Sequence, residues 1–195
     1  RGMLTFNLTG FWNELQDSVA NVTIAQGPAN VPGIGFVPAG GEGRRKMNLD
    51  RTRVRGTAVA TRWTISPALA VEVQYLYNDA TVTRASVAPW LTGLRLAQVP
   101  RQSASAGLQW HLGRWSVAPR ARWIGAQYED DTNRLELAAV TVVDLSATAA
   151  LGRQTEIFVS AENIFDHRIE TGRSADGLVN VGTPRLILVG FRVWR

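Results

Sequence analysis

Acidic residues and histidines are the side chains of this sequence that could perform proton-transfer or metal chemistry. Glu129, Asp130 and Asp131 form one acidic run, and paired carboxylates act as general acid and base when one pKa is raised. The surrounding residues are polar and predict no such shift, so we interpret the run as part of a solvated loop. His111 and His167 lie on different segments, without a partner at the spacing of a metal site or a catalytic triad. The sequence therefore predicts no enzyme, no metal site and no cofactor.

The composition excludes further classes of site. No cysteine is present among the 195 residues, which rules out disulfides, thiolate metal sites and cysteine nucleophiles. The glycine-rich segment 26–43 lacks the Gly-Lys-Ser/Thr ending of a phosphate loop, so we interpret it as an external loop. The net charge of +5 comes almost wholly from arginine. Because these arginines are spread over several strand-like runs and no recognition helix accompanies them, no nucleic acid is expected as a partner.

The elements that must position these residues are strands, because apolar and polar residues alternate with a period of two. Segment 103–112 places alanine, leucine and tryptophan on one face, and serine, glycine, glutamine and histidine on the other. Segments 69–78 and 143–149 repeat the pattern. The outer face of a soluble sandwich would normally carry lysine and glutamate, whereas the polar face here is small and mixed. The pattern favours a membrane barrel, with a soluble carbohydrate-binding sheet as an alternative.

The predicted fold class is all-β: a portion of an antiparallel transmembrane β-barrel, with about eight long strands joined by alternating short turns and long loops. The strands span residues 3–24, 47–63, 68–83, 101–112, 115–127, 135–150, 154–166 and 184–195. The turns centre on residues 65–67, 113–114 and 152–153, and the loops span residues 25–46, 84–100, 128–134 and 167–183. Each strand reaches the roughly 10 residues that a tilted strand needs to cross an apolar band about 25 Å tall.

Strand parity assigns side chains to the two faces of this wall. The lipid-facing residues of the last strand are Ile187, Val189, Phe191 and Val193, whereas Gly190 and Arg192 face inward. The charged residues of the polar face are Glu72, Arg120, Arg122, Asp144 and Glu162, and we expect them to form ion pairs across the lumen wall. Tryptophans near strand ends, namely Trp63, Trp110 and Trp115, fit an interfacial girdle. Trp12 and Trp123 lie further inside their strands and are not assigned to it.

The closing segment, from Glu162 to Arg195, carries the most informative pattern of the chain. It contains Glu162-Asn163-Ile164-Phe165-Asp166, a glycine-punctuated loop, and Gly182-Thr183-Pro184-Arg185 before an alternating strand. In its order and spacing with Val143-Asp144-Leu145, Tyr128-Glu129-Asp130-Asp131-Thr132-Asn133 and the run 48–56, it resembles the end of a TonB-dependent outer-membrane receptor. The resemblance covers nearly the whole chain.

The resemblance implies a bacterial outer-membrane location and a ligand-gated barrel of about 22 strands. Receptors of this family have an N-terminal plug and a TonB-contacting segment, and they import metal chelates, cobalamin or sugars. We expect residues 1–195 to be the C-terminal segment of such a barrel, without the plug and the earlier strands, forming a curved sheet with two unpaired edges. No secretion signal follows Arg1, so a mature or truncated piece, or a cytosolic chain, is expected. The alternative is a complete eight-stranded barrel with an anchoring or adhesion role.

The expected function is therefore a part in TonB-energised uptake of a metal chelate, siderophore-like, or of a similar scarce nutrient. The expected partners are outer-membrane lipid and lipopolysaccharide, the small ligand, and the TonB complex through the missing N-terminal part only. Ligand contacts are expected in the external loops, at Trp90, Tyr128 and Arg173. Arg44 and Arg45, at the basic end of the first loop, are expected to bind lipopolysaccharide phosphates or an anionic chelate, because guanidinium groups bind oxyanions in bidentate fashion.

Overall fold

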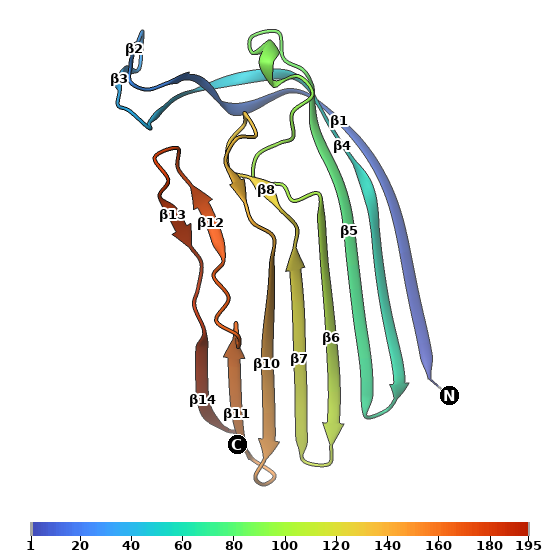
Figure 1. Ribbon diagram of the computed structural model, residues 1–195. Helices are drawn as coiled ribbons and strands as arrows, with labels where there is room; N and C mark the ends of the chain where they lie inside the picture. Colours follow the sequence, from blue (N-terminus) through green and yellow to red (C-terminus); the bar gives the residue numbers. More distant parts are fainter. Residues whose placement is uncertain (1, 195) are drawn as a thin grey trace.

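The structure is a computed structural model that describes residues 2–194, and its main feature is a curved antiparallel sheet of eight strands (Figure 1). The strands are β1 (Met3–Gln26), β4 (Glu42–Ser66), β5 (Leu69–Arg84), β6 (Gln102–Leu112), β7 (Trp115–Ile124), β10 (Val140–Ala150), β11 (Thr155–Glu162) and β14 (Leu186–Val193). Each strand pairs with the next one in this order. Among residues 2–194, no helix has the length and apolar character of a membrane span.

The predicted alternation of short turns and long loops is confirmed. The turns after β4, β6 and β10 lie together at one end of the sheet, and the longer connections lie at the other (Figure 1). These connections contain elements of their own: β2 (Ala29–Val31), β3 (Gly35–Val37), the 3-10 turn η1 (Pro89–Leu91), β8 (Gln127–Tyr128), β9 (Glu136–Leu137), β12 (Glu170–Arg173) and β13 (Val179–Val181). The loops are therefore folded structures rather than plain connections.

Two predicted strand starts were wrong, for a tertiary reason in each case. β4 begins at Glu42 instead of residue 47, because β1 and β4 continue to pair as a two-stranded ribbon up to the pair Gln26 and Glu42. β10 begins at Val140 instead of residue 135, because residues 136–137 pair with residues 127–128 as β8 and β9. Residue 195 of the last predicted strand lies outside the described residues.

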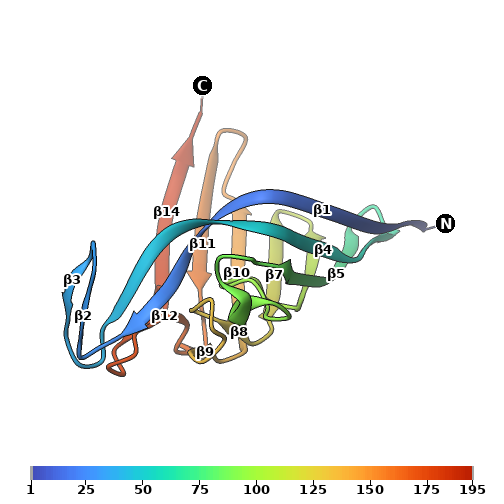
Figure 2. The ribbon, with the colours of Figure 1, turned by 90° about the horizontal axis from the view of Figure 1, so that it is seen from above.

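The sheet is open, as predicted. β1 and β14 occupy its two edges, at opposite sides of the sheet in Figure 1, and the view from above shows β1 and β4 running crosswise in front of the more distant strands β14, β11 and β10 (Figure 2). Within the described residues, β1 pairs only with β4, and β14 pairs only with β11. Both edges therefore present unpaired backbone groups, which are available to further strands of a larger barrel.

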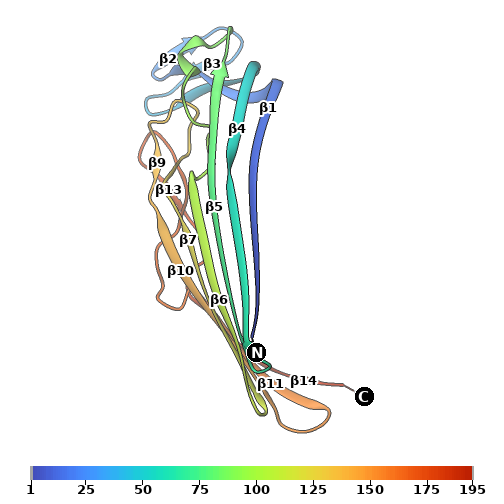
Figure 3. The same ribbon diagram turned by 90° about the vertical axis from the view of Figure 1, so that its right-hand side faces the viewer.

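The two faces of the sheet have opposite polarity, and the apolar face is not covered. Val71 and Leu108 are register partners on the apolar face, and both side chains are only partly buried, as is that of Leu145. A soluble globule would bury such residues in its centre. The main buried apolar cluster lies instead beside the loops and contains Val22, Leu49, Val82, Ala85, Ala88 and Leu91. The long strands are a thin wall in side view (Figure 3), and its apolar face matches the lipid-facing surface of an outer-membrane barrel.

Tryptophans mark two levels of this apolar face. Trp63, Trp110 and Trp115 are exposed beside the short turns, where a girdle was expected. Trp123 shares a strand and a face with Trp115 and lies eight positions further along. With a rise of about 3.3 Å per residue and a tilt of about 40°, the two levels are about 20 Å apart. Trp12 extends this second level on β1, so this level contains the two tryptophans that the sequence left unassigned. Trp12 lies in the middle of β1, although it is at the membrane boundary, because β1 continues well beyond the membrane to Gln26.

The three most characteristic sequence segments meet at Asn163, through its backbone amide and its side chain. The Asn163 amide N–H donates to Asp144 Oδ1 at 3.0 Å, which joins the segment to Val143-Asp144-Leu145. Asn163 Nδ2 donates to His167 O at 2.9 Å and to Thr183 O at 3.3 Å, and Asn163 Oδ1 accepts from His167 N at 3.0 Å. The Arg185 amide donates to Asp166 Oδ1 at 2.8 Å. Hydrogen bonding thus explains the order and spacing of these three segments.

Candidate functional site

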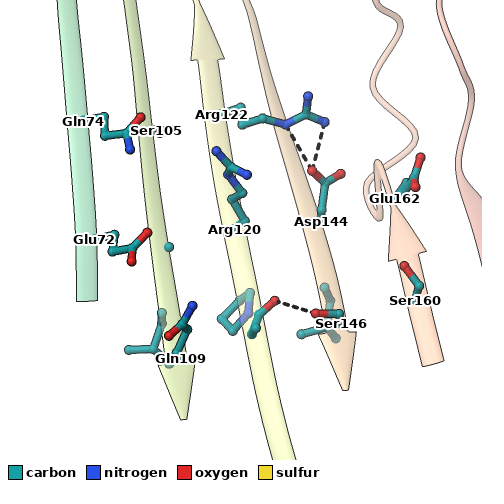
Figure 4. Close-up of a pocket in the computed structure, with 15 residues that line it drawn as sticks. Glu72, Gln74, Ser105, Gln109, Arg120, Arg122, Asp144, Ser146, Ser160 and Glu162 are labelled. Atoms are coloured by element: carbon teal, nitrogen blue, oxygen red, sulfur yellow. Dashed lines mark hydrogen bonds and ion pairs between the residues drawn. The ribbon is translucent and has the colours of Figure 1, made fainter. Parts of the chain in front are cut away.

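The polar face of the sheet lines a concave region of about 530 Å³ between β5 and β11 (Figure 4). Every second residue of a strand points to this side, so each strand contributes polar groups at regular steps. The polar side chains that line the region are Glu72, Gln74, Ser105, Gln109, Arg120, Arg122, Asp144, Ser146, Ser160 and Glu162. These residues belong to the face that was predicted to line the lumen. A polar wall of this kind contacts water or a polar domain.

Ion pairs brace this wall across neighbouring strands. Arg122 Nη2 lies 2.9 Å from Asp144 Oδ2, and Arg62 pairs with Glu72. For Arg122, Asp144 and Glu72, the predicted ion pairing is thus confirmed. Within residues 2–194, Arg120 and Glu162 have no ion-pair partner, so the prediction was wrong for these two. The register places Asp144 directly opposite Arg120, but Arg122, two positions along, reaches Asp144 instead.

The external loops form a connected cap, in which loop 128–134 is the central piece. Asp131 accepts two hydrogen bonds from Thr23 of the β1–β4 ribbon, from the amide at 2.8 Å and the hydroxyl at 2.6 Å. Asp130 is 1% exposed and accepts the amides of Arg134 and Leu135 at 2.9 and 2.7 Å. The interpretation of this acidic run as merely solvated was therefore wrong, because both aspartates accept structural hydrogen bonds.

The loop between β5 and β6 joins the same cap. Asn133 Oδ1 accepts the Arg95 amide at 2.8 Å, and Asn133 Nδ2 donates to the Arg95 carbonyl at 2.9 Å. The Arg95 guanidinium lies over the Tyr128 ring, 5.4 Å from its centroid, as in a cation–π contact. The Gln98 amide donates to Tyr128 O at 2.6 Å. These bonds hold the second and third loops in a fixed relation.

A cavity of about 350 Å³ lies where the ribbon meets these two loops. Its charged and polar lining comprises Asn21, Arg44, Arg95, Gln98, Glu129 and Asp131, and the apolar part of its lining includes Leu49, Val82 and Leu91. The two guanidinium groups can contact oxyanions and the apolar floor can contact an organic frame, while Glu129 and Asp131 leave the lining without net formal charge. Within residues 2–194, no cluster of three or more side chains could hold a bare metal ion.

The residues predicted to bind ligand lie on different parts of the cap. Arg44 lines the cavity and pairs with Glu42 at 2.7 Å, and Tyr128 lies under Arg95, which also lines it. Arg45 donates to Pro32 O at 2.9 Å. Trp90 is 53% exposed on η1, and Arg173 on β12 pairs with Glu170 at 3.0 Å. Arg44 and Arg95 both line the cavity, whereas the other four predicted residues do not.

Sequence reasoning missed Arg95, which lies in a loop without an apolar or polar period. The alternation of short turns and long loops was a usable signal, because the loop before β6 and the loop after β7 leave the sheet at the same end and their residues can meet.

The tip of the fourth loop lies beside the first loop. A Cβ added to Gly40 would lie 2.9 Å from Cβ of Asp176. In that fourth loop, hydrogen bonds from Ser174 and the Leu178 amide lower the pKa of Asp176 below its ordinary value.

Replacing Asp131 by alanine is expected to release the ribbon from the third loop. The change removes both acceptors of Thr23, each bond to a charged group being worth about 1.5 to 3 kcal/mol. We expect faster hydrogen exchange at residues 20–25 and 128–134, and faster protease cleavage there, with little change in the strands below. Asp131→Asn keeps one acceptor oxygen and should give an intermediate rate. Unchanged exchange in Asp131→Ala would show that the contact does not hold the cap.

Comparison with known proteins shows which family has this architecture. The family model described as TonB dependent receptor-like, beta-barrel, matches residues 1–164. No curated protein sequence matches the chain. The solved structure of the siderophore receptor PiuA from Acinetobacter baumannii is 16% identical, covers 97% of this chain and 26% of its own, and has a TM-score of 0.75.

Two other solved structures show the same likeness. For the ferric yersiniabactin uptake receptor FyuA from Yersinia pestis, the identity is 17%, the coverage 97% of this chain and 27% of that one, and the TM-score 0.74. For the copper transporter OprC, these values are 15%, 97%, 29% and 0.72. At such identities the likeness shows the fold, and the chain spans about a quarter of the length of these proteins. Because the family model matches most of its length, the chain belongs to the TonB-dependent receptor β-barrel family of the bacterial outer membrane.

Proposed function

We propose that residues 1–195 are the C-terminal segment of the barrel of a ligand-gated receptor, which takes up a metal chelate with energy delivered through TonB. The observation that carries this proposal is the cap cavity lined by Arg44 and Arg95, on the loop side of a wall whose other end has only short turns. A receptor captures its ligand on the loop side and passes it through the lumen. The family consists of receptors and transporters, which supports the proposal that the chain is not an enzyme.

A metal chelate is favoured over cobalamin or a sugar by two observations. The guanidinium groups of Arg44 and Arg95 can contact the oxyanions of a ferric chelate with catecholate or carboxylate ligands, and Glu129 and Asp131 balance their charge in the lining. The named cargoes of the similar structures are a siderophore, ferric yersiniabactin and copper. These cargoes belong to those proteins, and they differ from one another. The class of ligand is therefore proposed here without choosing a member.

The alternative function, anchoring or adhesion by a closed eight-stranded barrel, has no specific observation in its favour. It requires hydrogen bonding between β1 and β14, and within the described residues these strands form the two free edges of the sheet. The proposed receptor instead needs these edges for pairing with the remaining strands of a larger barrel.

The proposal is tested by ligand binding to the whole protein, solubilised from the outer membrane in mild detergent. The probes are ferric citrate, a ferric catecholate, cupric ion and cobalamin, and binding is followed by quenching of tryptophan fluorescence. We expect saturable binding of one metal probe and none of cobalamin. Arg44→Ala and Arg95→Ala should each weaken that binding about tenfold, the loss of one charge-assisted contact.

The matched control is Arg153→Ala, which removes the same charge at the turn between β10 and β11, at the opposite end of the wall. This variant should bind like the unaltered protein. Binding of cobalamin alone would contradict the proposed ligand class. Equal losses in all three variants would show that the cap cavity does not take the ligand.

A further inference from the structure

A proline lies in the middle of a central strand of the wall. Pro119 belongs to β7, which has β6 on one side and β10 on the other. Proline has no N–H group, so within a sheet it leaves one acceptor of a neighbouring strand without its partner. For this reason prolines in sheets occur almost only in edge strands and at bulges. The central position of Pro119 therefore needs a physical explanation.

The ladder is interrupted on the β6 side of this proline. The register between β6 and β7 runs from the pair 103–124 to the pair 107–120, and it resumes at the pair 110–117. The two pairs between them, which would join Leu108 to Pro119 and Gln109 to Ala118, are missing from this part of the described sheet. Toward β10, the register continues through Pro119 without a break. Since a hydrogen-bonded antiparallel pair exchanges two N–H···O bonds, the acceptor that loses its donor is the carbonyl of Leu108.

This interruption, the proline step, lies at the middle of the membrane. Pro119 is four positions from Trp115 and four from Trp123 on the same strand. These tryptophans mark the two levels that are about 20 Å apart, so the proline step is about 10 Å from each. In the hydrocarbon layer, a backbone carbonyl without a hydrogen-bond donor is strongly destabilising, and lipid tails offer no donor. The donor for Leu108 must therefore come from the lumen side.

The wall is open to the lumen at the proline step. The side chains of Leu108 and Pro119 have the parity of the apolar face, so these residues line the concave region of about 530 Å³ through their backbone atoms. Gly107, the preceding residue of β6, has the parity of the polar face and no side chain. A Cβ added to Gly107 would have only Pro119 O within 4 Å, at 3.9 Å. A small molecule can therefore approach the Leu108 carbonyl from the lumen.

Polar groups surround this opening. Arg120 is the register partner of Gly107, and among the described residues it has no ion-pair partner. Ser105 and Gln109 of β6 line the same region (Figure 4). The Leu108 carbonyl can only accept a hydrogen bond, whereas a guanidinium group can only donate. A ligand that serves both groups must donate to one and accept from the other. Water does both, and sites with two to four polar partners are typical of ordered water in proteins.

We infer that water binds at the proline step from the lumen side and donates a hydrogen bond to the Leu108 carbonyl, so that the inner wall is hydrated at half the height of the membrane. Ordered water is one of the means by which backbone groups freed by proline are satisfied within membranes. Any domain that fills the lumen then contacts β6 and β7 through this water instead of by dry packing. The inference rests on the outer-membrane location and is independent of the nutrient that the receptor takes up.

The first arm of the test is a crystal structure of the whole protein at a resolution that shows ordered water. We expect a water oxygen about 2.7 to 3.2 Å from Leu108 O. In the variant Pro119→Ala, the new amide N–H should take the place of this water. A protein side chain or amide at hydrogen-bond distance from Leu108 O in the unaltered protein would overturn the inference. A dry carbonyl with no donor would also overturn it.

The second arm measures hydrogen exchange of the whole protein in lipid vesicles. Pro119→Ala supplies the missing donor, so the amides of Leu108 and Trp110, on either side of the proline step, should exchange about fivefold more slowly, the effect of one net hydrogen bond. The matched control is Pro89→Ala, which replaces a proline of η1 in the loop between β5 and β6. This control should leave the exchange rates in β6 unchanged. Unchanged rates in Pro119→Ala would show that the Leu108 carbonyl is not open to water in the unaltered protein, and would overturn the inference.

Discussion

Arginine in place of Val73 is expected to lower the free energy of unfolding of the protein in lipid vesicles by about 2 to 4 kcal/mol, the cost of a cation near the bilayer midplane on a lipid-facing strand. Val73 is 46% exposed on the apolar face of β5. It lies four positions from Leu69 at the turn and six from Asp79, the first charged outward residue of β5, so the hydrocarbon layer extends on both sides of it. The measurement is a urea titration of the folded fraction.

The neighbouring residue is the control for this substitution. Gln74 points to the opposite face and lines the concave polar region (Figure 4). Gln74→Arg introduces the same side chain one position away, and it should change the free energy of unfolding by less than about 1 kcal/mol. The difference between the unfolding free energies of the two variants measures the effect of the surroundings of each face, hydrocarbon or water. Similar losses in both would mean that Val73 does not face hydrocarbon.

The strands and their faces could be predicted from the sequence because they depend on local alternation. Whether a residue faces lipid or lumen is decided by its parity within one strand, so segment 103–112 carries the information by itself. The alternation of turns and loops follows in the same way, from the spacing of glycine and proline. These features can be predicted without knowing which strands are neighbours. The neighbours are also easy to predict here, because each strand pairs with the next one along the chain.

The loops could not be predicted, because their structure depends on contacts between segments far apart in the chain. Asp131 looks like a solvated acid until the β1–β4 ribbon brings Thr23 against it, 108 positions away. Arg95 belongs to the candidate site only because Asn133 holds its backbone. Trp12 lies at a membrane boundary only because the register aligns it with Arg55 and Asp79. Each case needs the three-dimensional register, which no periodicity contains.

Asn163 is the position where a characteristic sequence motif and the stability of the fold coincide. Its side chain makes the three hydrogen bonds to His167 and Thr183, it is 2% exposed, and its backbone has a φ of 49°. Asparagine tolerates this left-handed conformation better than most residues, since a Cβ without a local hydrogen bond costs about 1 to 2 kcal/mol there. The motif therefore selects asparagine for two separate physical reasons.

Asn163→Ala is expected to lower the free energy of unfolding by about 2 to 4 kcal/mol, because it adds backbone strain and removes the three hydrogen bonds that the Asn163 side chain makes to the backbone of residues 167 and 183. The fourth loop, residues 167–183, should become sensitive to protease, since its two ends are no longer joined. Asn163→Gly removes the same hydrogen bonds without the strain at positive φ, so it should be more stable than the alanine variant by about 1 kcal/mol. Asn180→Ala, at an exposed position of β13, is the control and should behave like the unaltered protein. If alanine and glycine were equally tolerated, the segments at Asp144, Asn163 and Thr183 would be held by backbone pairing alone, and the hydrogen bonds of Asn163 would not explain their spacing.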